Sequence, residues 1–200
     1  MKLYDISQEV FGCAVYPGDP APKAEAVCRM TAGDLYNLTA FSMCAHNGTH
    51  VDAPYHFIPH GKTVEQIPLE KTVGLCFVAE WEGILDGEGA RQILRRAALA
   101  VRESARRILL KGDATVSAEA ARVFAEGGVD LIGNESQTVG PENAPMEVHT
   151  ILLGADVVLL EGIRLSDVPE GVYFLSAAPL SLAESDGAPC RAVLAEWPLG

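Results

Sequence analysis

The sequence predicts an α/β fold with a mixed sheet, because three observations agree. The chain has 200 residues, of which 48% are hydrophobic and 21% charged, and this composition suits one compact core. Its second half alternates between helical and strand patterns. Its first 75 residues lack a helical pattern and consist of short strands and ordered loops. We therefore expect a single domain over residues 1–200.

The N-terminal part is expected to form strands, turns and loops. One strand is predicted at 2–6 and another near 37–45, and the run from Tyr16 to Pro20 is typical of a turn. From Thr72 onward, apolar residues alternate as in a half-buried strand. Proline-rich loops are expected around Pro54, Pro59 and Pro68.

The remainder of the chain alternates between helices and strands. Ser117 is a good N-cap, and the pair Gly127-Gly128 is a good stop for the helix that follows it. Parallel and antiparallel strands are both expected, which makes the sheet mixed. The predicted helices cover 89–102, 117–126 and 141–152, and the predicted strands cover 107–111, 129–132, 156–160, 172–177 and 192–196.

Charge and cysteine content limit the partners and the compartment. With 27 acidic and 15 basic residues the net charge is −12, so nucleic acid is not an expected partner. No uncharged apolar run of membrane-spanning length occurs, and the N-terminus lacks the apolar run of a signal peptide. We therefore expect no membrane partner. The cysteines lack a C-x-x-C pair and are expected to be small buried residues in a reducing cytoplasm. They are Cys13, Cys28, Cys44, Cys76 and Cys190.

A basic stretch interrupts the acidic chain between Arg91 and Lys111. It holds seven basic residues, and Glu103 is its one acid. A basic helix can dock a nucleic acid or an acidic partner. Apolar residues such as Ile93 and Ala97 have amphipathic spacing, so we expect the basic side to be solvated or to face another subunit.

The strongest functional signal is a cluster of histidines, since four of the five fall within fifteen residues. In an extended chain alternate side chains share a face, so His50 and Asp52 lie side by side, with His46 and His56 directed in from either end. Imidazole and carboxylate groups in one turn suit a zinc- or manganese-type ion. The fourth member, His60, is expected to be an ordinary surface residue.

Two other interpretations of the cluster compete with the extended one, and the helical one is set aside. The spacing of His46 and His50 also occurs in H-E-x-x-H helices, but Asn47 occupies the general-base position and Gly48 weakens a helix. The whole set can also be a solvated polar loop without metal.

Residues 46–56 resemble the H-x-G-T-H-x-D-x-P-x-H motif of the cyclase family of metal-dependent hydrolases. They read His46-Asn47-Gly48-Thr49-His50-Val51-Asp52-Ala53-Pro54-Tyr55-His56. Bacterial kynurenine formamidases and isatin hydrolases belong to that family. The likeness extends to residues 4–7, 16–19, 63–74 and 186–191, the last being similar to a D-G-S-P-x-R element. The resemblance implies a single-domain, swivelling β/β/α-type fold.

The resemblance also implies a two-ion metal centre. In the formamidases, a later histidine and a glutamate twelve residues beyond it join the first two histidines and the aspartate of the motif. Here His149 is the one remaining histidine, and Glu161 follows it by twelve residues. Both carboxylates would bridge two divalent ions, expected to be Zn²⁺ with Mn²⁺ as the alternative. The implied ligands are His46, His50, Asp52, His149 and Glu161.

Catalytic and substrate-binding roles follow from the same resemblance. His56 corresponds to a proton shuttle, which takes a proton from the attacking water and returns it to the leaving group. The alternative role for His56 is a further metal ligand. Tyr16 stands where the formamidases carry an aromatic residue, usually tryptophan, that contacts the substrate. Residues 133–138, Gly-Asn-Glu-Ser-Gln-Thr, depart from the family pattern G-x-D-x-P-S. Both departures fall where we expect the substrate pocket.

The implied activity is hydrolysis of a small amide by metal-bound hydroxide. N-formylkynurenine, which would give kynurenine and formate in tryptophan catabolism, is the first candidate substrate. The alternatives are hydrolysis or ring closure of another small cyclic or acyl amide, such as isatin, and a metal-holding protein without catalysis. The presence of His56, which the ligand scheme does not need, argues against a loss of activity. The expected partners are this small-molecule substrate and further copies of the chain, in a homodimer or homotetramer.

Overall fold

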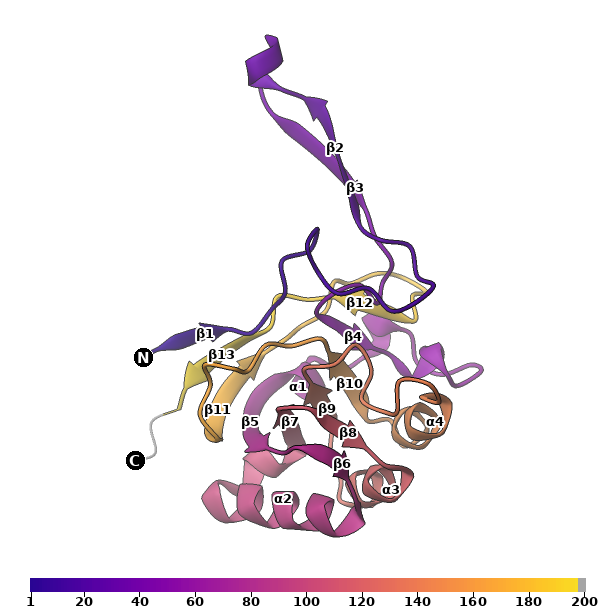
Figure 1. The fold of residues 1–200 in the computed structure, drawn as a ribbon, viewed down its shortest axis with the longest axis vertical. Helices are drawn as coiled ribbons and strands as arrows, with labels where there is room; N and C mark the ends of the chain where they lie inside the picture. Colours follow the sequence, from indigo (N-terminus) through magenta and orange to yellow (C-terminus); the bar gives the residue numbers. More distant parts are fainter. Residues whose placement is uncertain (198–200) are drawn as a thin grey trace.

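A nine-stranded mixed sheet that curls on itself dominates the structure, a computed structural model that describes residues 1–197 (Figure 1). The four central strands are parallel, and the strands on either side of them are antiparallel to their neighbours. The predicted α/β fold class with a mixed sheet is therefore confirmed. In order across the sheet the strands are β1 (Leu3–Asp5), β13 (Val193–Glu196), β11 (Gly171–Ser176), β5 (Val73–Glu80), β7 (Arg107–Lys111), β9 (Leu131–Asn134), β10 (Val158–Glu161), β4 (His50–Asp52) and β12 (Gly187–Pro189).

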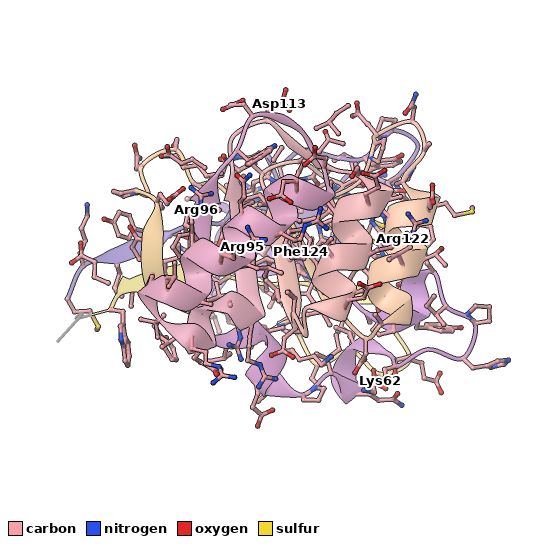
Figure 2. The ribbon with its side chains drawn as sticks, turned by 90° about the horizontal axis from the view of Figure 1, so that it is seen from below. Lys62, Arg95, Arg96, Asp113, Arg122 and Phe124 are labelled. Atoms are coloured by element: carbon pink, nitrogen blue, oxygen red, sulfur yellow. The ribbon has the colours of Figure 1, made fainter. Side chains whose placement is uncertain are left out.

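Three helices cover one face of the parallel strands (Figures 1 and 2). The Ser117 side chain caps one of them by accepting a hydrogen bond from the Ala120 amide at 3.2 Å, so the predicted N-cap is confirmed. Apolar side chains such as Phe124 are fully buried against the sheet, and each contributes about 1.5–3 kcal/mol to stability. None of the helices within residues 1–197 has the length and apolar character needed to cross a bilayer. The helices are α2 (Gly87–Ala100), α3 (Ala118–Glu126) and α4 (Met146–Gly154).

The opposite face of the sheet encloses a second apolar core. Side chains from both halves of the sheet meet there, including Val78, Leu160 and Leu194. Strand β12 runs into β13 through residues 190–192, although the two strands lie near opposite ends of the sheet order. Such a short link requires the two ends of the sheet to approach one another. The sheet is therefore curled into an incompletely closed barrel.

Most predicted elements are present, with shifted ends. The helix expected from residue 141 begins at Met146, because the preceding residues form turns up to Pro145. The helix predicted to end at residue 102, α2, ends at Ala100, and a 3₁₀ turn, η4 (Arg102–Arg106), follows it. The first 75 residues contain one short helix that was not expected, α1 (Leu69–Thr72). They also contain the 3₁₀ turns η2 (Pro54–His56) and η3 (Val64–Gln66). The strands that the sequence did not predict are β2 (Lys23–Cys28), β6 (Gly83–Leu85), β8 (Ala114–Val116) and β12; residues 50–52, expected only as extended chain, form β4.

Strands β2 and β3 (Leu38–Ser42) form a separate antiparallel hairpin that projects from the body (Figure 1). Its tip carries the 3₁₀ turn η1 (Met30–Ala32), closed by Gly33 with a φ of 98°. A two-stranded hairpin alone in water is marginally stable at best. Exposed large apolar side chains nevertheless line this one: Val27, Met30, Leu35, Tyr36, Leu38 and Phe41.

The basic stretch runs along the exposed side of α2, through η4 and into β7, where Arg107 is buried. Arg96 pairs with Glu170 at 3.0 Å, and Arg106 pairs with Asp130 at 2.6 Å. Figure 2 shows Arg95 and Arg96 along α2, on the face seen from below. Since acidic side chains of the same chain meet these cations, the geometry favours a solvated, internally paired face.

The cysteines differ from the expectation that they are all buried. Cys76 is buried, whereas the other four are partly exposed. All five are free thiols. Burial raises the pKa of the Cys76 thiol to about 12, so this side chain packs as a neutral apolar group.

Candidate metal centre

The histidine-rich run folds into a turn, a short strand and a 3₁₀ turn. Gly48 adopts a left-handed φ of 65° in the turn, and a Cβ there would lie 2.8 Å from the Cβ of Cys13. Residues 50–52 form β4, so His50 and Asp52 point to the same side. The extended geometry predicted for these two residues is confirmed. His56 ends the 3₁₀ turn η2 that follows.

Two further side chains reach the same place from distant elements. Glu161 ends β10 and lies opposite His50 in the β10–β4 pairing. His149 comes from α4, where its Nδ1 lies 2.9 Å from the carbonyl oxygen of Pro145. The structure thus brings together the five residues that the sequence analysis named as ligands. All of them are buried except His46, which is partly exposed.

The two carboxylates each present one oxygen to either side of the centre. Asp52 Oδ1 lies 2.8 Å from His46 Nδ1 and 3.3 Å from His50 Nε2, whereas its Oδ2 lies 3.6 Å from His149 Nε2. Glu161 Oε2 lies 3.5 Å from His50 Nε2, and its Oε1 lies 3.2 Å from His149 Nε2. The donors therefore form two groups that share Asp52, and the ligand atoms of each group lie within 4.8 Å of one another.

One buried oxygen supports the presence of a cation. Asp52 Oδ2 is buried and has no hydrogen-bond partner among residues 1–197. An unpaired buried carboxylate oxygen is costly, and a cation between Asp52 and His149 would satisfy it. Imidazole and carboxylate donors are the set that zinc-type ions prefer. The residues present therefore fit a divalent metal.

The carboxylates also hold protons on the histidines. Burial opposes protonation of His46 and His50, but hydrogen bonds to carboxylates outweigh it and raise the pKa of His46 to about 11 and that of His50 to about 9. Burial alone would raise the pKa of Asp52, yet its hydrogen bonds from these histidines hold the pKa well below its usual range. Metal ligands must be deprotonated, so protons and a metal ion compete for this centre.

His56 lies beside the five candidate ligands and contacts Asp186, a carboxylate to which the sequence analysis assigned no role. Its ring stacks on that of His46 with centroids 4.0 Å apart. Asp186 Oδ2 lies 3.2 Å from His56 Nδ1 and 2.9 Å from His46 Nε2. These hydrogen bonds hold the pKa of the Asp186 carboxyl far below its usual range. The three residues also form a third group with ligand spacing, but His56 and Asp186 are partly exposed.

Sequence reasoning missed Asp186, although it begins the segment 186–191 that resembles a family element. The structure shows why it matters: Asp186 immediately precedes β12, which pairs with β4 so that Gly187 lies opposite Asp52. A side chain at 187 would meet the His46 ring at 2.8 Å, so glycine permits this approach. The D-G dipeptide was the available signal.

A cavity of ≈ 370 Å³ opens onto the centre. Tyr16 forms part of its wall, and the Tyr16 hydroxyl donates a hydrogen bond to the Glu142 carbonyl oxygen at 2.8 Å. Gln137 and Thr138, from the segment that departs from the family pattern, also line it. The two departures from the family pattern, Tyr16 and the segment 133–138, thus both lie at the cavity, as the sequence analysis expected.

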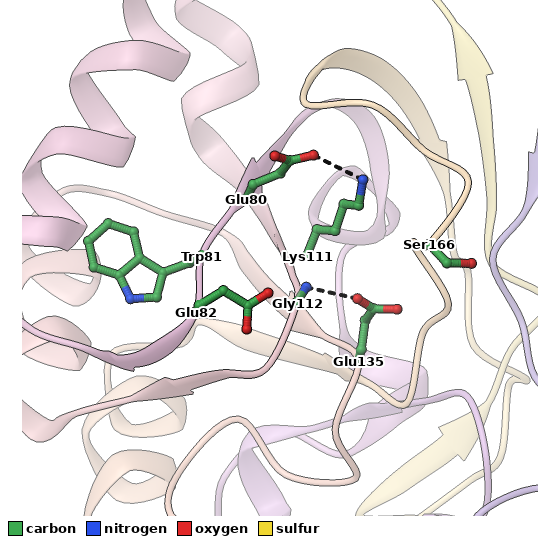
Figure 3. A pocket seen from close by; sticks show the side chains of 7 residues that line it. All are labelled: Glu80, Trp81, Glu82, Lys111, Gly112, Glu135 and Ser166. Atoms are coloured by element: carbon green, nitrogen blue, oxygen red, sulfur yellow. Dashed lines mark hydrogen bonds and ion pairs between the residues drawn. The ribbon is translucent and has the colours of Figure 1, made fainter.

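A second, larger cavity of ≈ 680 Å³ lies at the ends of β5 and β7 (Figure 3). Its charged side chains contact one another or backbone amides: Lys111 pairs with Glu80 at 2.9 Å, and Glu82 accepts a hydrogen bond from the Asp113 amide at 3.3 Å. Glu135 accepts hydrogen bonds from the backbone amides of Gly112 and Leu165 at 2.9 and 2.8 Å. This cavity does not include the histidine centre, and its carboxylates serve the fold.

The fold and the site define an α/β protein with a largely buried histidine–carboxylate centre whose donors fit a divalent metal. Residues 4–141 match the family model described as "Putative cyclase", and the chain belongs to this cyclase family, as the motif predicted.

Relatives match along almost the whole chain. A kynurenine formamidase of Erythrobacter litoralis is 35% identical over 206 residues, which cover 98% of this chain and 95% of that protein. One of Salinibacter ruber is 33% identical over 212 residues, covering 99% of each. A solved structure described as a potential metal-dependent hydrolase with cyclase activity has a TM-score of 0.80 at 29% identity, over 98% of this chain and 99% of that one. Isatin hydrolase A from Labrenzia aggregata, at 21% identity, shares the fold with a TM-score of 0.77, over 96% and 93% of the two chains.

Proposed function

We propose that this chain is an arylformamidase-like amide hydrolase that converts N-formylkynurenine to kynurenine and formate, in the tryptophan catabolism of the cytoplasm. One observation carries the proposal: Asp52 and Glu161 each present an oxygen to both sides of a buried centre, and His56 stands beside it. The relatives named kynurenine formamidase support the choice of substrate.

The centre is proposed to hold two Zn²⁺ ions, with Mn²⁺ as the alternative. Two ions bring four positive charges, and Asp52 and Glu161 neutralise two of them, so the centre keeps a net positive charge. When bound, such ions polarise a carbonyl group and lower the pKa of a water molecule. The residues that would hold them are the three histidines of the two donor groups, His46, His50 and His149, together with the two carboxylates.

The chain's own residues orient the substrate and move the proton. The cavity is within the size range of small-molecule sites, and the Tyr16 ring supplies one flat wall. The imidazole of His56 accepts a proton from the attacking water and donates it to the nitrogen as the C–N bond breaks. The water oxygen ends in formate, and the nitrogen leaves as the aryl amine of kynurenine.

A substrate screen with defined metals tests the proposal. The protein is stripped with a chelator, reloaded with Zn²⁺ or Mn²⁺, and assayed on N-formylkynurenine, isatin and simple aryl formamides. We expect hydrolysis of N-formylkynurenine that disappears on stripping and returns with metal. Activity on isatin alone would support the cyclic-amide alternative. Refusal of every formamide by the metal-loaded protein would contradict the formamidase assignment.

Replacing Tyr16 with alanine is expected to raise KM and leave metal content unchanged. A wall that binds the ground state and the transition state alike affects affinity more than kcat. Tyr16→Phe is the matched control, because it keeps the ring and removes only the hydrogen bond to Glu142. Steady-state kinetics on the metal-loaded variants give the answer. An unchanged KM in Tyr16→Ala would leave the residue a role in the turn only.

We also propose that the chain assembles as a homodimer or homotetramer through the hairpin 23–42. The hairpin exposes large apolar side chains, which in a monomer rarely form extended patches. Its two acidic and two basic residues cancel, whereas the whole chain carries a charge of −12. Another copy can therefore approach here with little like-charge repulsion, and a two-fold axis would let each copy cover the other's hairpin.

Leu35→Asp is expected to reduce the assembly to smaller species. Leu35 is 93% exposed on the hairpin, so an aspartate there places a charge in the proposed contact without disturbing the core. Leu99→Asp is the matched control, since Leu99 is 87% exposed on α2, away from the hairpin. Light scattering coupled to size exclusion measures the mass. A wild-type mass for Leu35→Asp, or a monomeric wild-type protein, would contradict the proposal.

A further inference from the structure

We propose that Asp186 is a positioning residue that fixes the ring orientation and the tautomer of two histidines at once. The inference rests on the proposed function, because it takes His56 as the proton shuttle. Both contacts fall on one oxygen: Asp186 Oδ2 lies 2.9 Å from His46 Nε2 and 3.2 Å from His56 Nδ1. The two rings are stacked with 28° between their planes, so a single carboxylate holds them as a pair.

The two contacts select complementary ring nitrogens. An ionised carboxylate only accepts hydrogen bonds, so each nitrogen that faces Asp186 must carry a proton. For His46 this leaves Nδ1 as the nitrogen able to bind a metal ion, which would displace the proton that Nδ1 shares with Asp52 Oδ1 at 2.8 Å. For His56 it leaves Nε2 as the basic nitrogen for proton transfer. One side chain thus prepares a ligand and a shuttle for their separate roles.

The backbone around Asp186 is held firmly enough to serve this purpose. The Ala53 amide donates to the Asp186 carbonyl oxygen at 2.9 Å, and the Val64 amide donates to that of Ser185 at 2.9 Å. Gly187 then begins β12 against β4. These bonds tie the carboxylate to the same strand that carries the histidine motif, so its position relative to His46 and His56 is fixed by the fold.

The test combines kinetics, metal analysis and NMR on the zinc-loaded protein. Asp186→Asn keeps the shape but puts an NH₂ donor where the carboxylate accepted. We expect kcat to fall by about 10- to 100-fold, the range typical of groups that orient metal ligands, with KM little changed and zinc content maintained at saturating zinc. Asp113→Asn, on the exposed loop before β8, is the control and should behave as wild type.

Two further readouts separate positioning from a general structural role. Long-range proton–nitrogen NMR of labelled histidines should show the wild-type His56 proton on Nδ1, and a mixture of tautomers in Asp186→Asn. In a His56→Ala background, Asp186→Asn should cost much less kcat than it does alone, because it acts through that ring. A wild-type His56 proton on Nε2, an unchanged kcat or full additivity would each overturn the proposal. Loss of a zinc equivalent from Asp186→Asn at saturating zinc would also overturn it, because Asp186 would then be a ligand itself. If the wild-type protein rejects formamides, only the proposed function fails, since the NMR result still judges Asp186.

Discussion

Replacing Asp52 with asparagine is expected to empty the metal centre and abolish hydrolysis. Asp52 belongs to both donor groups, and its two oxygens face His46 and His50 on one side and His149 on the other. Asparagine has nearly the same shape but carries no negative charge and offers only one oxygen. The loss should exceed the roughly 10- to 100-fold effects typical of groups that merely orient a ligand.

Metal analysis of the purified Asp52→Asn protein checks this expectation, together with its activity after reloading with zinc. Asp167→Asn, an exposed carboxylate, serves as the matched control and should keep both metal and activity. A thermal unfolding scan of both variants confirms that the chain is folded. Tightly held metal at full occupancy in Asp52→Asn would show that this carboxylate is not the bridge.

Replacing His56 with alanine is expected to preserve the bound metal and remove most of the turnover. His56 stacks on His46 and is not one of the five proposed ligands, and a proton shuttle contributes about 10²- to 10⁴-fold to the rate because it acts in the transition state. The measurement is kcat and metal content on the same sample, with His60→Ala as the control. His60 is exposed and does not line the cavity.

The outcomes for His56→Ala are distinct. A loss of metal in step with activity would make His56 a ligand, which the third donor group would then explain. An unchanged rate would contradict the shuttle role. Glu135 could not take the role over as the structure stands, because both its oxygens accept backbone hydrogen bonds in the other cavity.

The sequence predicted the fold best where a pattern repeats over many residues. The helix after Ser117 has a cap, an apolar stripe and a glycine stop, and β7 occupies the predicted residues 107–111. Three-residue strands such as β12 contain too few residues for any periodicity to appear. Strand β2 was missed because almost all of its residues are exposed. It therefore has no apolar face directed toward a core.

The candidate site was predictable where the ligands lie in a compact motif or at a family spacing. The placement of His149 and Glu161 next to Asp52 follows from how α4 and β10 pack, and it agrees with that spacing. Asp186 was missed, because its contact with His46, 140 positions earlier in the chain, depends on the pairing of β12 with β4, which the D-G dipeptide alone does not specify. A local pattern carries no information on such a pairing.

The short link between β12 and β13 has a consequence during synthesis of the chain. Asp52 is made 134 residues before Asp186 (186 − 52), which at about 5–20 residues per second corresponds to roughly 7–27 seconds of translation. Throughout that time β4 lacks its neighbour β12, and the barrel cannot close because β13 follows directly. In a nascent chain β4 therefore has no strand partner until β10 is made, and it is then an open edge strand until β12 pairs with it. The centre reaches its final geometry only when the last two strands dock.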